Sequence, residues 1–227
     1  MKKIFLIVAI SVLATSLYAQ KKENRKVGDF SYISMGINAD VFIKQGSISE
    51  VILEGDEETL ENTETYVSGN KLKIRSDNSS WWKNSKKIKI YITLKEFTGV
   101  SVSGSGSVVN EGMLKGENVE LHVSGSGDID LNLQARDTDI SISGSGSVSL
   151  QGKGKTAGLS ISGSGKLDAQ DYVLETITIR ISGSGGAYIY ATKEIDSRIS
   201  GSGTVRYKGE PDKLSNRSSG SGRLRKM

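Results

Sequence analysis

Hydrophobic and polar residues alternate along most of the chain, and the alternation is repeated on both sides of the tetrapeptide Ser-Gly-Ser-Gly. The tetrapeptide starts at seven places, 18 to 21 residues apart: Ser103, Ser124, Ser143, Ser162, Ser182, Ser200 and Ser219. The residue just before it is Val or Ile in the first six copies, and the fifth residue after its first serine is apolar in all seven. Because alternation with period two is typical of a strand with one buried face, each repeat is predicted to contain two strands joined by the tetrapeptide.

A sequence period of about 20 residues is typical of a solenoid, in which each unit buries its apolar face only by stacking on its neighbours. The pattern therefore predicts an all-β fold, a single-stranded parallel β-helix that is right-handed and has 18 to 21 residues per coil. The tetrapeptide would form a corner in every coil, since glycine adopts backbone angles that other residues avoid and serine is small enough to stack. A flexible linker is the alternative, but a linker would not keep apolar residues at fixed offsets on both sides.

The first third of the chain has no Ser-Gly-Ser-Gly but alternates in the same way. Four segments are predicted to be strands: residues 40–46, 50–55, 70–76 and 87–94. The acidic segment 56–66 between them is expected to hold one short helical turn. We expect one β-helix domain over residues 28–227, with a separate small β-domain over 28–100 as the alternative.

Within that domain we expect irregular first coils over residues 28–100, repeat coils over 101–222 and a C-terminal tail over 223–227. Apolar positions that face inward in earlier coils turn polar near the C-terminus, where Ser197, Asn216 and Ser218 occupy them. The last coil is also rich in basic residues and is expected to cap the stack, because charge discourages another chain from pairing with an open strand edge.

The N-terminus has the layout of a secretory signal peptide. Residues 1–3 carry two lysines, residues 4–17 are apolar or small, and Ala19 supplies the small residue that a signal peptidase requires. We expect a signal peptide over residues 1–19, a flexible segment over 20–27, and export to the periplasm, the outer-membrane surface or the medium. A retained membrane anchor is the alternative reading. No second apolar stretch reaches the roughly 20 residues that span a bilayer, so no transmembrane segment is expected after signal removal.

Composition narrows the choice of partners. The chain has 30 basic and 26 acidic residues, and removal of Lys2 and Lys3 with the signal peptide leaves 28 against 26. A charge this small and dispersed predicts no nucleic-acid partner. The chain has no cysteine, so its stability cannot depend on disulfides.

Several segments together resemble a known family. They are "DVFIKQG" (40–46), "VILEGDEE" (51–58), "VSGNKLKIRS" (67–76) and the Ser-Gly-Ser-Gly coils. This combination is similar to the head GIN domain proteins of Bacteroidetes, a family of auto-transporter adhesins, over residues 28–225. The resemblance implies a single-stranded β-helix on the cell surface or in the periplasm and a role in adhesion. It brings no set of catalytic residues.

The sequence contains no convincing set of catalytic or metal-binding residues. Asp130 and Asp168 fall in one column two coils apart, as a glycosidase pair would require, but Ser149 stands between them and no aromatic platform lies beside them. His122 faces outward without a second histidine or a cysteine as a fellow metal ligand. The glycine runs lack the lysine and the following helix of a phosphate-binding loop. We predict that the protein is not an enzyme and has no catalytic residue, cofactor or metal site.

Two adjacent tryptophans, Trp81 and Trp82, lie in a segment rich in Ser, Asn and Lys. They are the candidate ligand-contact residues, because indole rings stack on sugars and anchor protein contacts. The alternative is that one of them plugs the N-terminal end of the coil stack. A second aromatic group, Tyr188, Tyr190 and Tyr207, is expected to fill the core near the C-terminal coils.

The sequence therefore predicts an exported, non-enzymatic binding module of the adhesin type. A stiff repetitive face would make many weak contacts with a glycan or a protein on a cell surface. One alternative is a structural envelope protein that assembles as a homo-oligomer, and another is a carbohydrate-active β-helix enzyme.

Overall fold

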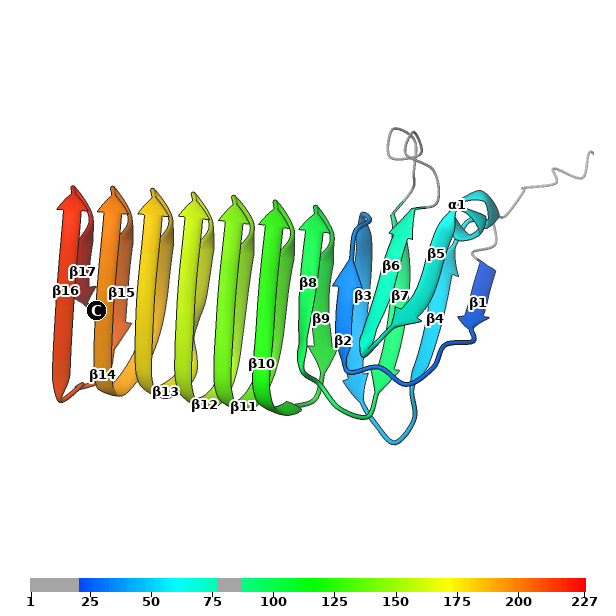
Figure 1. Ribbon diagram of the computed structural model, residues 1–227, viewed down its shortest axis with the longest axis horizontal. Coiled ribbons are helices and arrows are strands. Elements are labelled where there is room, and N and C mark those ends of the chain that lie inside the picture. The colour runs from blue at the N-terminus through cyan, green and yellow to red at the C-terminus, as the bar shows by residue number, and fades with distance from the viewer. Residues whose placement is uncertain (1–20, 77–86) are drawn as a thin grey trace, which may run out of the picture.

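The computed structural model describes residues 21–76 and 87–227, which form a β-solenoid of about seven turns (Figure 1). All seventeen described strands belong to one sheet that winds around the core. The early strands are β1 (Lys21–Arg25), β2 (Tyr32–Met35), β3 (Ala39–Gln45), β4 (Glu50–Gly55), β5 (Thr63–Ser68), β6 (Lys71–Ser76), β7 (Ile88–Leu94), β8 (Gly99–Gly104) and β9 (Ser107–Glu111). The later strands are β10 (Leu114–Gly125), β11 (Asp128–Gly144), β12 (Ser147–Gly163), β13 (Lys166–Gly183), β14 (Gly186–Gly201), β15 (Thr204–Lys208), β16 (Lys213–Gly220) and β17 (Arg223–Lys226).

Each repeat coil has two layers joined at two corners. Figure 1 shows a front sheet, formed by the strands that run into each Ser-Gly-Ser-Gly corner, and a back sheet, formed by the strands that leave it. A long strand such as β11 runs along the back sheet, bends at the lower corner and continues along the front sheet. Parallel register places Ile140 beside Leu121 and Leu159 of the neighbouring coils. The predicted parallel β-solenoid is thus confirmed.

The Ser-Gly-Ser-Gly segments form the upper corners, and each corner is bonded to the one before it. The amides of Ser145 and Gly146 both donate to the carbonyl oxygen of Gly125, at 2.9 and 3.0 Å. Gly144 has φ +110°, and a Cβ atom built on it would lie 2.5 Å from the same oxygen. This glycine is therefore required both by the backbone angle and by the close approach of the next coil.

The N-terminal coils do not stack in chain order. Tyr32 of β2 pairs with Lys71 of β6 on one side and with Gly99 of β8 on the other, and β3 likewise lies between β7 and β9. Strands β4 and β5 pair antiparallel with β7 and β6, so they close this end of the solenoid. The expected helical turn is α1 (Glu57–Glu61), where the Asp56 side chain accepts a hydrogen bond from the amide of Thr59.

Two sequence-based boundaries are wrong. Residues 20–27 were expected to be flexible, but Lys21–Arg25 form β1, which pairs antiparallel with β4. This strand covers an edge that would otherwise expose unpaired backbone groups, and Lys22 adds an ion pair with Glu54 at 3.2 Å. Residues 223–227 are not a tail, because β17 pairs in parallel with β15 and Leu224 packs against the core.

The core is mainly a stack of Val, Ile and Leu side chains, and its largest fully buried member is Tyr172. The Tyr172 hydroxyl lies 3.0 Å from the Thr138 hydroxyl, which satisfies both buried groups. The expectation that Tyr188 and Tyr190 fill the core is wrong, because both lie half-buried on the outer surface of the back sheet. The Lys166 ammonium lies 4.9 Å from the centre of the Tyr188 ring. Tyr207 does pack against the core.

Candidate functional site

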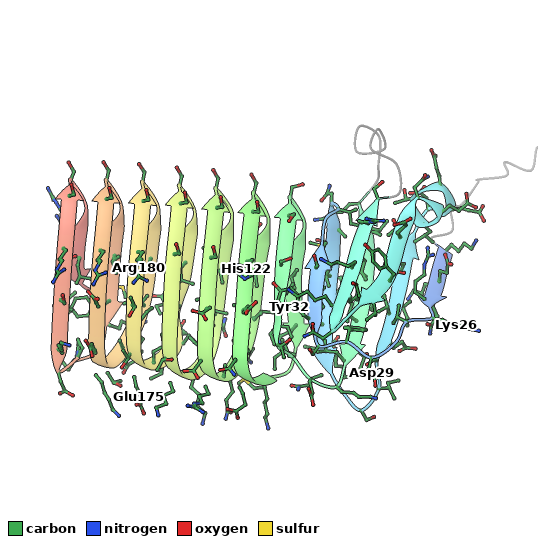
Figure 2. The ribbon with its side chains drawn as sticks, viewed as in Figure 1. Lys26, Asp29, Tyr32, His122, Glu175 and Arg180 are labelled. Atoms are coloured by element: carbon green, nitrogen blue, oxygen red, sulfur yellow. The ribbon has the colours of Figure 1, made fainter. Side chains whose placement is uncertain are left out.

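Outward side chains of the front sheet form straight columns, because every coil has the same register. The column two residues before each Ser-Gly-Ser-Gly contains Ser101, His122, Ser141, Ser160, Arg180, Arg198 and Arg217. Its last three members are stacked arginines on β13, β14 and β16, which we call the arginine ladder. In Figure 2, His122 and Arg180 project from the same sheet at the same level along their strands.

The arginine ladder forms one wall of a groove of about 470 Å³ that crosses four coils. The other wall is the column formed by the first serine of each corner, Ser162, Ser182, Ser200 and Ser219. Between the two columns lie Ile161, Ile181 and Ile199, whose side chains point into the core. The groove thus presents hydroxyl groups at all four coil levels and guanidinium groups at three of them, with Ser160 in place of arginine at the first. This combination suits an anionic ligand with hydrogen-bonding groups.

Few acidic groups neutralise the arginine ladder. Arg198 lies 3.4 Å from Asp196, and the neighbouring Glu194 is paired with Lys213 at 2.6 Å, which raises the pKa of Lys213. Within the described part of the chain, Arg180 and Arg217 form no side-chain hydrogen bond or ion pair. The surrounding C-terminal segment, residues 198–227, has eight basic residues and only two acidic ones.

Residues singled out by the sequence for other chemistry do not converge. Asp130 and Asp168 lie on the outer surface of the back sheet with Ser149 paired between them, and Lys166 lies 3.7 Å from Asp168. His122 is partly exposed and lies 3.7 Å from Glu120. No cluster of three or more His, Cys, Asp or Glu side chains with the geometry of a metal site occurs among residues 21–76 and 87–227.

Trp81 and Trp82, the ligand-contact residues predicted from the sequence, lie outside the described residues. Their role therefore stays a prediction. In the part of the chain that the structure does describe, no helix has the length and hydrophobicity needed to cross a bilayer.

A model of the family described as "Putative auto-transporter adhesin, head GIN domain" matches residues 29–211. The chain therefore belongs to the head GIN domain family, as the sequence resemblance predicted. No curated protein matches the chain significantly.

Solved structures with the same fold come from Bacteroides and Parabacteroides. A putative adhesin from Bacteroides fragilis has a TM-score of 0.87 and 26% identity, and the match covers 92% of this chain and 97% of that one. A putative lipid binding protein from Parabacteroides distasonis has a TM-score of 0.72 and 25% identity over 92% and 97% of the two chains. A putative adhesin from the same species has a TM-score of 0.69 and 20% identity over the same shares, and at that identity the likeness shows the fold alone.

Sequence reasoning missed the arginine ladder although the signal was present. Alignment on the repeated tetrapeptide already places Arg180, Arg198 and Arg217 at one offset, in a column interpreted only as polar. From the sequence alone, the basic residues of the last coil predict only a cap. What the sequence lacked was the pairing of Glu194 with Lys213, which depends on the register between β14 and β16. Asp196 and Arg198 lie two residues apart on β14.

Proposed function

We propose that this protein is an exported, non-enzymatic binding module of the adhesin class that holds its ligand by repeated contacts along the solenoid. Its membership of an adhesin family supports this proposal, since the description of that family names adhesion and no catalytic activity. The predicted signal peptide over residues 1–19 supports export, and we propose a location in the periplasm, on the outer-membrane surface or outside the cell.

The observation that carries the proposal is the register of the outer columns. Hydrogen-bonded coils place equivalent side chains about 4.8 Å apart in a straight line, as in the column from Ser101 to Arg217. A ligand with a repeating structure can therefore make the same contact at several levels. Because the scaffold is ordered before binding, little conformational entropy is lost, and weak contacts add up to a useful affinity.

The test is binding of the purified mature chain to a panel of glycans and cell-surface preparations, followed by a length series of any sugar polymer that binds. Affinity should rise with ligand length until the ligand spans the repeat coils. Binding to no surface or polymer would contradict the proposal. Release of reducing sugar from a polysaccharide would instead support the enzyme alternative, and concentration-dependent growth in light scattering without ligand would support the self-assembling envelope protein.

Location is tested separately by adding protease to intact cells of the native host. Cleavage of the chain before the cells are lysed is expected for a surface module. Complete protection until the outer membrane is opened would place it in the periplasm instead.

A further inference from the structure

We propose that the arginine ladder and its serine-lined groove bind a linear acidic polysaccharide that carries a carboxylate or sulfate on successive sugars. This inference rests on the proposed binding function and names the ligand class for it. It assigns Arg180, Arg198 and Arg217 as the charged contacts and the parallel serine column as the neutral hydrogen-bonding side.

The geometry fits an extended polymer. The three arginines occupy directly paired positions on adjacent strands, so their Cα atoms step along the solenoid by about 4.8 Å per coil. This step is close to the length of one sugar ring in an extended glycan. A guanidinium group bonds a carboxylate or sulfate through two parallel N–H donors, which fixes orientation as well as charge. The serine hydroxyls across the groove can both donate to and accept from sugar hydroxyls.

The charge arrangement is costly for the unliganded protein. Like charges directly opposite one another on neighbouring strands are destabilising. The fold does not require arginine at this column, because Ser141 and Ser160 occupy the same column one and two coils earlier. Three arginines at paired positions, with Asp196 as their one acidic partner among the described residues, are therefore explained by a bound polyanion better than by stability.

Other polyanions fit less well. Successive phosphates on one strand of duplex DNA advance by about 3.4 Å along the helix axis and wind around it, so they do not form a straight line with the coil step of about 4.8 Å. Proteins that bind single-stranded nucleic acid stack bases on aromatic side chains, and none of the described residues lining the groove is aromatic. Insertion into a lipid surface needs exposed apolar side chains, whereas the isoleucines of the groove are buried in the core.

The experiment compares the wild type with two triple variants of equal charge. The ladder variant is Arg180→Ser/Arg198→Ser/Arg217→Ser, which installs the residue that earlier coils carry at this column. The control variant is Arg206→Ser/Arg223→Ser/Arg225→Ser, which removes three arginines from the back sheet. The probes are polygalacturonate, heparin, neutral dextran, duplex DNA and anionic phospholipid vesicles, measured by calorimetry at two salt concentrations.

We expect the wild type and the control variant to bind polygalacturonate or heparin with salt-dependent affinity. The ladder variant should lose at least about tenfold, because each exposed ion pair contributes modestly and three are removed together. The ladder variant should also melt no lower than the wild type without ligand, and it should lose the rise in melting temperature that the polyanion gives the wild type. A Ser141→Arg/Ser160→Arg variant, which extends the ladder to five levels, should bind more tightly.

Equal losses in the two triple variants would overturn the assignment, since net charge alone would then explain binding. Tighter binding of DNA or of vesicles than of either acidic polysaccharide would overturn the ligand class. Binding of dextran or another neutral glycan, unchanged in the ladder variant, would overturn this inference and leave the proposed function standing. Failure to bind any glycan or cell surface would contradict the proposed function itself.

Discussion

At the scale of single residues, the stacking depends most on the glycines of the Ser-Gly-Ser-Gly corners. The first glycine of each corner has a positive φ that side-chain-bearing residues rarely adopt. From the second repeat onward its missing Cβ also leaves room for the carbonyl oxygen of the previous corner. Gly104 is the exception, because it has the same kind of φ, +111°, and no atom of the described residues lies within 4 Å of a Cβ built on it.

Because of this difference, the cost of the positive φ and the cost of crowding the neighbouring corner can be measured separately. Gly104→Ala should lower the free energy of unfolding by about 1–3 kcal/mol, the cost of backbone strain alone. Gly144→Ala should cost about 1–3 kcal/mol more, because its Cβ would also meet the Gly125 oxygen at 2.5 Å. Chemical denaturation of both variants checks this, and equal losses would show that the close approach of the coils contributes nothing.

Ser197 is a second informative residue. It occupies an inward position beside Ile179, is fully buried, and its hydroxyl has no hydrogen-bond partner among residues 21–76 and 87–227. Ser197→Ala should therefore raise the free energy of unfolding by about 1 kcal/mol, because an unsatisfied buried hydroxyl is removed. The exposed Ser160→Ala is the matched control, with a change near zero in the same denaturation assay. A loss of stability in the Ser197 variant would contradict this account of the hydroxyl.

At the scale of elements, the N-terminal end of the solenoid is built differently from the repeat coils. The N-terminal end is closed by the antiparallel strands β1, β4 and β5, and Glu54 of β4 lies at the centre of an ionic group there. Its carboxylate lies 3.2 Å from Lys22 and 3.9 Å from Lys89, and it accepts a hydrogen bond of 3.1 Å from Tyr91.

This group predicts a pH dependence of stability. The hydrogen bond from the Lys22 ammonium holds the pKa of Glu54 below its ordinary value of 4.5, and burial only partly opposes it. A lowered pKa in the folded state adds stability that is fully present above pH 4.5 and is lost as the pH falls through the folded-state pKa. Glu54→Gln should therefore lower the melting temperature at neutral pH and have progressively less effect in acid. An effect of Glu54→Gln that stays constant with pH would contradict the prediction.

The elements also show where prediction from sequence succeeds. Fixed offsets around the tetrapeptide are enough to predict how the strands pair next to each corner from β10 to β14, but the register shifts farther from the corner between β12 and β13 and between β13 and β14. The insertion of β2 and β3 between later strands could not be predicted, because alternation identifies a strand and says nothing about its neighbours. Tyr172 was missed for a related reason. It lies where the register between β12 and β13 shifts, and Gly154 leaves the space that its hydroxyl occupies.

At the scale of the whole molecule, different positions of the solenoid serve stability and ligand recognition. Inward positions hold the apolar stack, and outward positions are free to vary from coil to coil without changing the fold. The column that runs from Ser101 to Arg217 illustrates this, because serine, histidine and arginine occupy equivalent places. The fold could be predicted from the inward columns. The arginine column of the candidate site could also be recognised from the sequence, but the pairing of Glu194 with Lys213 beside it could not, because that pair depends on the register between β14 and β16.

The central claim is that the Ser-Gly-Ser-Gly corners are bonded levels of one continuous stack, and amide exchange tests it most directly. The amides of Ser126, Ser145, Ser164, Ser184 and Ser202 each donate a 2.9 Å hydrogen bond to a glycine carbonyl of the preceding corner. Residue-resolved hydrogen–deuterium exchange should therefore show these five amides protected to a degree comparable with the core strands. Exchange at the rate of an unstructured glycine-serine peptide would contradict the account.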